Sequence, residues 1–160
     1  MTPVTTPVVT TETTTVTTTP GGNIQIIRIE SEEGNWLLRG QTFHLRISYD
    51  THPKNSGLSG VGVQIVLPNG IEYVGVDVKF NNNLFGGVTT NGNAVSFQYV
   101  DIMSTNWPGV DTPLDLMILE LRTTEKFFGG ELDINFSSTA AGFDGWTPGL
   151  ELFFGMLNNF

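Results

Sequence analysis

The sequence predicts an all-β fold, a sandwich of two sheets with about eight or nine strands. Three observations support this prediction. Apolar residues recur at every second position over most of the chain after Gly22, and no stretch of ten or more residues keeps the 3.6-residue period of an amphipathic helix. Segments rich in glycine and asparagine separate the alternating stretches at short intervals. No internal repeat is present, which argues against a solenoid.

The expected strands begin at residue 23. The segment NIQIIRIE at 23–30 carries isoleucines of both parities, so we expect its buried face to change midway, at a bulge or a change of sheet. The next strands, TFHLRISY at 42–49 and GVGVQIVL at 60–67, keep an apolar residue at every second position. Together these two strands predict an inward-facing row of Phe43, Leu45, Ile47, Tyr49, Val61, Val63, Ile65 and Leu67.

Five later segments also have the composition of strands, namely 71–80, 94–103, 114–123, 131–136 and 150–154. Within 114–123, the stretch LMILEL is apolar on both faces and predicts a strand in the middle of a sheet. Turns are expected where glycine and asparagine gather, because both adopt the positive φ that tight turns need. The expected turns are PNG at 68–70, FGG at 85–87, NGN at 91–93, FFGG at 127–130 and a longer loop, TAAGFDGWTPG, at 139–149.

Residues 1–22 differ from the rest of the chain, because eleven of them are threonine. We therefore expect a Thr-rich extension at 1–22 and one β-sandwich domain at 23–160. Two interpretations of the extension stay open: a spacer of the kind that adjoins secreted domains, or a donor strand that completes the sheet of a neighbouring copy. The donor strand depends on three valines of one parity, with Pro3 and Pro7 confining it to a sheet edge. These valines are Val4, Val8 and Val16.

Charge and composition exclude several functions. The chain has 16 acidic and 7 basic residues and a formal net charge of −9, so it should repel nucleic acid. It has no cysteine, and therefore neither disulfide bonds nor thiolate sites. No apolar stretch approaches the roughly 18 residues of a membrane span. Only 14% of the residues are charged, and such a neutral, polar surface predicts a secreted or cell-surface protein.

The segment SGLSGVGVQIVLPNGIEYVGVDV at 56–78 resembles a cohesin module, and GGELDINFSSTAAGFDG at 129–145 is similar to the last hairpin of such a module. The resemblance implies a nine-stranded jelly roll. It also implies a partner, because cohesins bind dockerins, which are small calcium-loaded helical modules, through one flat sheet face. Cohesins often use polar side chains on the strand that begins here at Gly60. At the matching positions this chain has Gly60 and Gly62, which offer no side chain.

Few residues offer catalytic chemistry. His44 lies on the polar side of its strand, His52 precedes a proline, and no serine lies in a nucleophile elbow. We therefore expect a non-catalytic protein with no cofactor. Calcium remains open, because Asp101, Asp111 and Asp115 flank one expected loop and carboxylates are calcium ligands.

Candidate binding residues lie on one strand and in two loops. Ser96 and Gln98 are expected to point outward from the strand at 94–103. Trp107 and Trp146 fall in expected loops, where an indole either stacks on a sugar or caps the core. Trp36, next to two leucines, is expected in the core.

Three functions follow, in decreasing order of support. The first is an extracellular attachment module of a surface or scaffold protein, which binds another protein module through a sheet face. The second is a filament subunit that binds copies of itself through the donor strand. The third is carbohydrate binding through Trp107 or Trp146.

Overall fold

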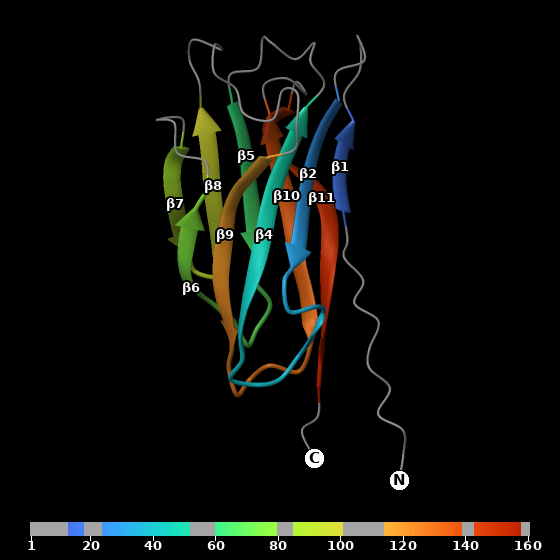
Figure 1. Ribbon diagram of the computed structural model, residues 1–160, viewed down its shortest axis with the longest axis vertical. Coiled ribbons are helices and arrows are strands. Elements are labelled where there is room, and N and C mark those ends of the chain that lie inside the picture. Colours follow the sequence, from blue (N-terminus) through green and yellow to red (C-terminus); the bar gives the residue numbers. More distant parts are fainter. Residues whose placement is uncertain are drawn as a thin grey trace.

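The computed structural model describes residues 13–17, 24–51, 60–79, 85–100, 114–138 and 143–157. Within these residues the regular structure consists of eleven strands in two sheets, so the predicted all-β sandwich is confirmed (Figure 1). None of these residues belongs to a helix with the length and hydropathy that crossing a membrane requires.

One sheet has five strands, and every pair in it is antiparallel. Its order is β1 (Thr13–Thr17), β2 (Ile24–Ser31), β4 (Thr42–Thr51), β9 (Leu114–Thr123) and β6 (Ile71–Val78). Strand β9, which contains LMILEL, lies between β4 and β6, as its two apolar faces predict.

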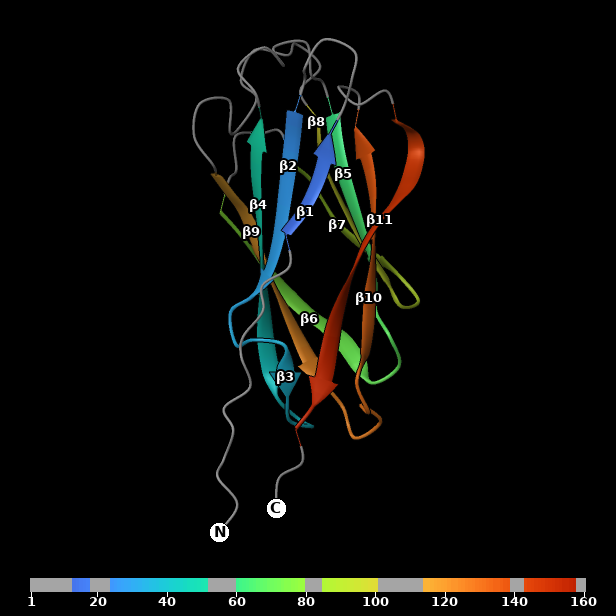
Figure 2. The ribbon, with the colours of Figure 1, turned by 90° about the vertical axis from the view of Figure 1, so that its right-hand side faces the viewer.

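The other sheet has six strands and lies against the first (Figure 2). Its order is β3 (Trp36–Leu37), β11 (Phe143–Met156), β10 (Gly130–Ser138), β5 (Gly60–Val66), β8 (Ala94–Val100) and β7 (Phe85–Asn91). Only the short contact of β3 with β11 is parallel.

The core lies between the sheets and is built from the inward parity of each strand. Seven of the eight side chains in the predicted inward row are buried, and that of Val61 lies outside the described side chains. The sheets are joined directly by the rings of Phe43 and Phe154, whose centroids are 5.2 Å apart. They are also joined by the Tyr99 hydroxyl, which donates a hydrogen bond to the Leu116 carbonyl at 3.0 Å. Burial on this scale is the main source of stability in such a fold.

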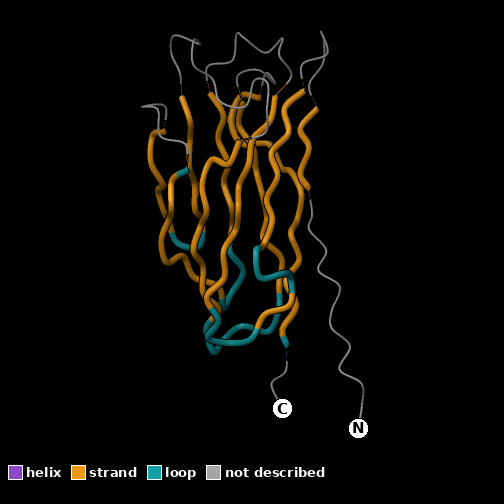
Figure 3. The backbone as a smooth tube through the Cα atoms, in the orientation of Figure 1, coloured by secondary structure: helices purple, strands orange, loops and turns teal. Residues whose placement is uncertain are grey.

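The described turns at 32–41, 67–70 and 124–129 gather at one end of the sandwich (Figure 3). The predicted PNG turn lies there, closed by the Ile71 amide, which donates a hydrogen bond to the Pro68 carbonyl at 3.2 Å. The Thr124 amide joins this turn to the end of β9, because it donates a hydrogen bond to the Gly70 carbonyl at 2.8 Å. Gly70 has a φ of +92°, and a Cβ on it would lie 2.5 Å from the Cα of Phe127. Only glycine fits at this position.

Several details differ from the prediction, beginning with eleven strands where about eight or nine were expected. Strand β11 begins at Phe143, so residues 143–149 form a strand instead of a loop, paired irregularly with β10. Strand β7 begins at Phe85, within the expected FGG turn, and a register shift before Val88 accommodates its glycines. Strand β2 pairs with β4 without a shift, so the expected bulge is absent there; a shift lies instead between β4 and β9, after Ile47. Strand β1 lies in the Thr-rich segment and pairs with β2 of its own chain.

Candidate binding surface

The outer face of the six-stranded sheet, here called the polar face, brings together neutral side chains from four strands. Thr89, Ser96, Gln64 and Asn135 lie opposite one another in successive pairs across β7, β8, β5 and β10. The Asn135 side-chain amide donates a hydrogen bond to Gln64 Oε1 at 3.2 Å. The row arises because the inward parity of these strands is apolar, which leaves every second residue to face outward.

The predicted candidates Ser96 and Gln98 both lie on this face, with Ser96 half-buried and Gln98 exposed. Gln98 lies opposite Gly62, and Gly60 lies opposite Val100 in the same pair of strands. A shallow hollow of about 380 Å³ covers this part of the face. It is lined by Gln64, Gly87, Thr89, Asn91, Ala94, Ser96, Phe97 and Gln98.

Three carboxylates continue the polar face toward β11. Asp133 lies directly opposite Glu151, and Glu131 is the next outward residue of β10. A hydrogen bond with Glu131, and then the negative charge of Glu131, raise the pKa of the exposed Glu151 carboxyl. Within the described part of the chain, none of these three acids forms a salt bridge. The polar face therefore carries negative charge that its own cations do not neutralise.

An aromatic pair ends the polar face. Trp36 and Phe153 are 40% and 45% exposed and meet edge to face, with centroids 6.1 Å apart. The expectation that Trp36 lies in the core is wrong: Leu37 takes the buried position, and the Trp36 indole lies on Gly155, where a Cβ would overlap its ring. Asn35 fixes this arrangement, because its side-chain amide donates to the Phe153 carbonyl at 2.7 Å.

The outer face of the five-stranded sheet, here called the ion-paired face, is charged, and its basic side chains lie next to carboxylates. His44 Nδ1 lies 2.5 Å from a Glu33 oxygen, and His44 Nε2 lies 3.9 Å from Glu120. The hydrogen bond with Glu33 raises the pKa of His44, although partial desolvation opposes it. Two arginines complete the network. Arg46 pairs with Glu32 and Asp115, and Arg122 pairs with Glu72.

Two groups of acids are candidates for a metal. Glu32, Glu33 and His44 place their ligand atoms within 4.8 Å of one another, but Glu32 already pairs with Arg46 and Glu33 already has the His44 ring as a hydrogen-bond partner. Of the predicted calcium ligands, Asp115 lies 3.8 Å from Arg46, and Asp101 and Asp111 lie outside the described residues. The calcium site therefore stays a prediction.

The remaining candidate residues lie partly or wholly outside the described residues. Trp107, His52, Val4 and Val8 lie outside the described residues. Trp146 lies in β11 instead of a loop, and its side chain is not among those described. Val16 lies in β1, opposite Gln25 of β2. Carbohydrate binding through the two tryptophans remains a prediction.

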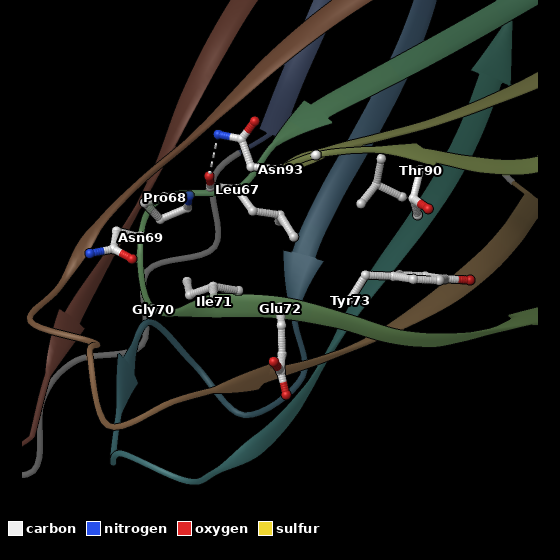
Figure 4. A pocket seen from close by; sticks show the side chains of 11 residues that line it. Leu67, Pro68, Asn69, Gly70, Ile71, Glu72, Tyr73, Thr90 and Asn93 are labelled. Carbon is white, nitrogen blue, oxygen red and sulfur yellow. Dashed lines mark hydrogen bonds between the residues drawn. The ribbon is translucent and has the colours of Figure 1, made fainter.

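A second concavity, which the sequence did not indicate, lies between β6 of one sheet and β7 of the other (Figure 4). This groove of about 530 Å³ has Leu67 and Ile71 in its interior and the Tyr73 ring beneath Thr90, while the Glu72 side chain points away. It arises where the edges of the two sheets meet, so no single segment of the sequence predicts it.

No family model matches the sequence, and no similar curated protein was found. Solved structures do match. A cohesin of Clostridium thermocellum, from the Coh-OlpA-Doc918 complex, is 14% identical with a TM-score of 0.57, over 83% of this chain and 99% of the cohesin. The major pilin subunit BcpA of Bacillus cereus is 13% identical with a TM-score of 0.55, over 82% of this chain and 41% of the pilin.

A fragment of the major pilin GBS80 of Streptococcus agalactiae is 9% identical with a TM-score of 0.57, over 76% of this chain. This chain thus spans about half of that fragment, of which 51% is covered, but nearly all of the matched cohesin. Identities this low compare folds and not partners. Together with the sheet order, they show that the chain has the cohesin-like, jelly-roll β-sandwich fold.

Proposed function

We propose that the chain is an extracellular, non-catalytic attachment module that binds another protein through the polar face. The observation that supports this most directly is the coexistence, on one sheet face, of carboxylates without a salt bridge and an exposed aromatic pair. Exposed aromatic side chains are frequent anchors of protein interfaces. Uncompensated charge selects a partner of opposite sign.

The polar face also fits binding in its neutral part. Amide and hydroxyl side chains such as Gln64, Ser96 and Asn135 lose less hydration free energy on burial than charged groups do. They can exchange water for a partner's hydrogen-bonding groups across the shallow hollow. The proposed partner is therefore a protein that presents lysine or arginine opposite the acids and an apolar contact opposite Trp36.

A catalytic role has little support in the described residues. His44 is their one histidine, and both of its ring nitrogens face carboxylates in an exposed ion-pair network with no hydroxyl nucleophile among its partners. This arrangement orients charges on a surface and does not assemble a reacting pair.

The experiment compares two variants with the same change of charge. The full chain is immobilised and offered first a calcium-loaded dockerin and then the secreted proteins of the source organism. In the first variant, Glu131→Lys and Glu151→Lys invert charge on the polar face. In the control, Glu72→Lys and Glu120→Lys do the same on the ion-paired face.

The polar-face variant should weaken binding of any retained partner by about tenfold or more, which corresponds to about 1.4 kcal/mol. The control should bind within about twofold of the unaltered chain. Equal losses in both variants would show a non-specific charge effect, and unchanged binding in both would remove the polar face from the proposal.

The open groove between β6 and β7 favours a second function, self-assembly into a filament. In this proposal, the N-terminal Thr/Val segment of one copy adds a strand to the sheet of the next. Deleting residues 1–12, which leaves β1 intact, should convert polymers into monomers, as measured by light scattering. If the segment is a spacer, the deletion leaves both the size and the partner affinity unchanged.

A further inference from the structure

As far as the described residues show, the sandwich is closed at its middle and open along β6. Tyr73 and Val76 of β6 lie opposite Leu121 and Leu119 of β9, so all four side chains point toward the core. Both leucines are fully buried, but Val76 remains 36% exposed and Tyr73 is only half-buried. The apolar layer thus continues to a sheet edge where the described residues do not cover it.

The same edge offers backbone hydrogen-bonding groups. Among the described strands, β6 ends the five-stranded sheet with β9 as its one partner, and β7 ends the six-stranded sheet with β8 as its one partner. The groove of about 530 Å³ lies between these two strands. An unpaired edge beside exposed apolar side chains is a template for an added strand.

The chain contains a segment that suits this template. Residues 1–11 carry no charged side chain and include Val4 and Val8 at the same parity. In a strand, alternate residues direct their backbone groups to the same edge and their side chains to the same face. Pro3 and Pro7 share the other parity, so one edge of the segment lacks N–H donors at these positions and the other edge keeps its donors.

Because of this parity, the edge by which the segment pairs also fixes the face to which its valine side chains point. The edge with intact donors belongs to the residues that include Val4 and Val8, so pairing by that edge turns both valines to one face. The proline edge faces away from the sheet, and it discourages the addition of a further strand. We propose that residues 3–10 of a second copy add to the free edge of β6 and place Val4 and Val8 over the groove. This proposal rests on the filament function proposed above.

The sheet order indicates that the added strand comes from a second copy and not from the same chain. Residue 13 begins β1, which lies four strand spacings from β6, or about 19 Å across the sheet. Val8 is five residues from Thr13, and five extended residues span at most about 18 Å. The segment of the same chain therefore cannot bring Val8 across the sheet to a groove beyond β6. A contact between different surfaces of successive copies propagates into a filament.

The first experiment measures the mass of the full chain by light scattering. Val76→Lys places a charge on the exposed inward side of β6, the strand that forms one wall of the groove, and should shift polymers to monomers. Thr90→Lys on the β7 wall should do the same. Phe153→Lys is the matched control, because Phe153 is 45% exposed but lies on the polar face. Circular dichroism verifies that each variant is folded. The double variant Val4→Asp with Val8→Asp should also be monomeric.

Mixing then identifies the junction. The Val76→Lys chain keeps an intact donor segment, and the Val4→Asp, Val8→Asp chain keeps an intact groove. An equimolar mixture should therefore form a complex of two chains that does not grow. Added peptide of residues 1–12 should occupy the groove of the donor-deficient chain and prevent this complex, whereas the peptide with both valines replaced by aspartate should not.

The outcomes separate the two proposals. If the donor variant is monomeric while both groove variants still polymerise, the filament function stands and the groove is not the acceptor. If the unaltered chain is monomeric at every concentration, both proposals are wrong. If Phe153→Lys disrupts assembly as strongly as Val76→Lys does, the junction lies on the polar face and the groove proposal fails.

Discussion

The two outer faces of this sandwich use charge in opposite ways. On the ion-paired face, each of His44, Arg46 and Arg122 has a carboxylate within 4.0 Å. On the polar face, Glu131, Asp133 and Glu151 lie near one another without a cation in the described part of the chain. Both faces cover the same apolar core, so burial of the core does not explain the difference.

This contrast supports the polar face as the proposed binding surface. Charges that are already paired gain little from a new contact, because binding must first replace the existing partner. Carboxylates that repel one another are stabilised electrostatically by any cation that approaches them. A protein can therefore keep one face stable and soluble while it leaves the other incompletely satisfied.

Reversing the central cation of the ion-paired face should have the largest effect on stability. Arg46→Glu removes the contacts with Glu32 and Asp115 and adds a fourth acid to that cluster, which includes Glu30 on the neighbouring strand. We expect a loss of about 1 kcal/mol, allowing for solvent screening of exposed pairs. The free energy of urea unfolding measures it.

The matched control for Arg46→Glu is Gln98→Glu, which adds an acid to the neutral part of the polar face. It should change the unfolding free energy by less than about 0.5 kcal/mol, as surface substitutions usually do. A loss as large as that of Arg46→Glu would mean that net charge, and not pairing, distinguishes the faces.

Adding a cation to the polar face should raise stability, by less than Arg46→Glu lowers it. Asp133→Lys places an ammonium group opposite Glu151 and beside Glu131. We expect Tm to rise by about 1–3 °C, because an opposite-charge pair replaces like charges across the strands. Thermal unfolding in about 1 M salt should remove most of the gain through screening. An unchanged or lower Tm at low salt would argue against repulsion on this face.

The pH dependence of Tm should be the smallest of these effects, and its pH range differs between the two faces. Both shifted groups bind a proton more tightly in the folded state, so each stabilises the fold at low pH and loses that contribution as pH rises. For Glu151 the loss begins above its usual pKa of 4.5, and for His44 above its usual pKa of 6.5. Each should change Tm by about 1 °C or less.

Two variants assign these pH windows. Glu151→Gln should flatten the pH dependence of Tm above about pH 4.5 while leaving the higher window intact. His44→Gln should do the reverse above about pH 6.5. Carbon and proton chemical shifts of the two side chains provide the direct readout, and a His44 pKa at or below 6.5 would contradict the assigned ion pair.

Much of the fold could be predicted, because the alternation of apolar and polar residues along a strand indicates which side chains are buried. The apolar row Phe43, Leu45, Ile47 and Tyr49 is buried as its spacing predicts, and LMILEL lies inside its sheet. The prediction failed where pairing with a neighbour overrides local composition. Residues 143–149 contain two glycines and a proline, which favour a turn, yet they extend β11 alongside β10.

The candidate surface was only partly predictable, because its parts come from distant positions. The outward parity of Ser96 and Gln98 follows from their own strand. The exposure of Trp36 depends on Gly155, which pairs with it from the far end of the chain, and nothing beside Trp36 in the sequence indicates that contact. The groove beside β6 depends on which strands end each sheet, and local periodicity does not encode that order.

The indole of Trp36 rests on a residue that has no side chain, and this has an evolutionary consequence. A single methyl group at Gly155 would lift the ring and tilt the aromatic end of the face, although every exposed residue stayed the same. Related chains could thus diverge in partner choice through a substitution hidden underneath the surface. A comparison restricted to solvent-facing positions would overlook it.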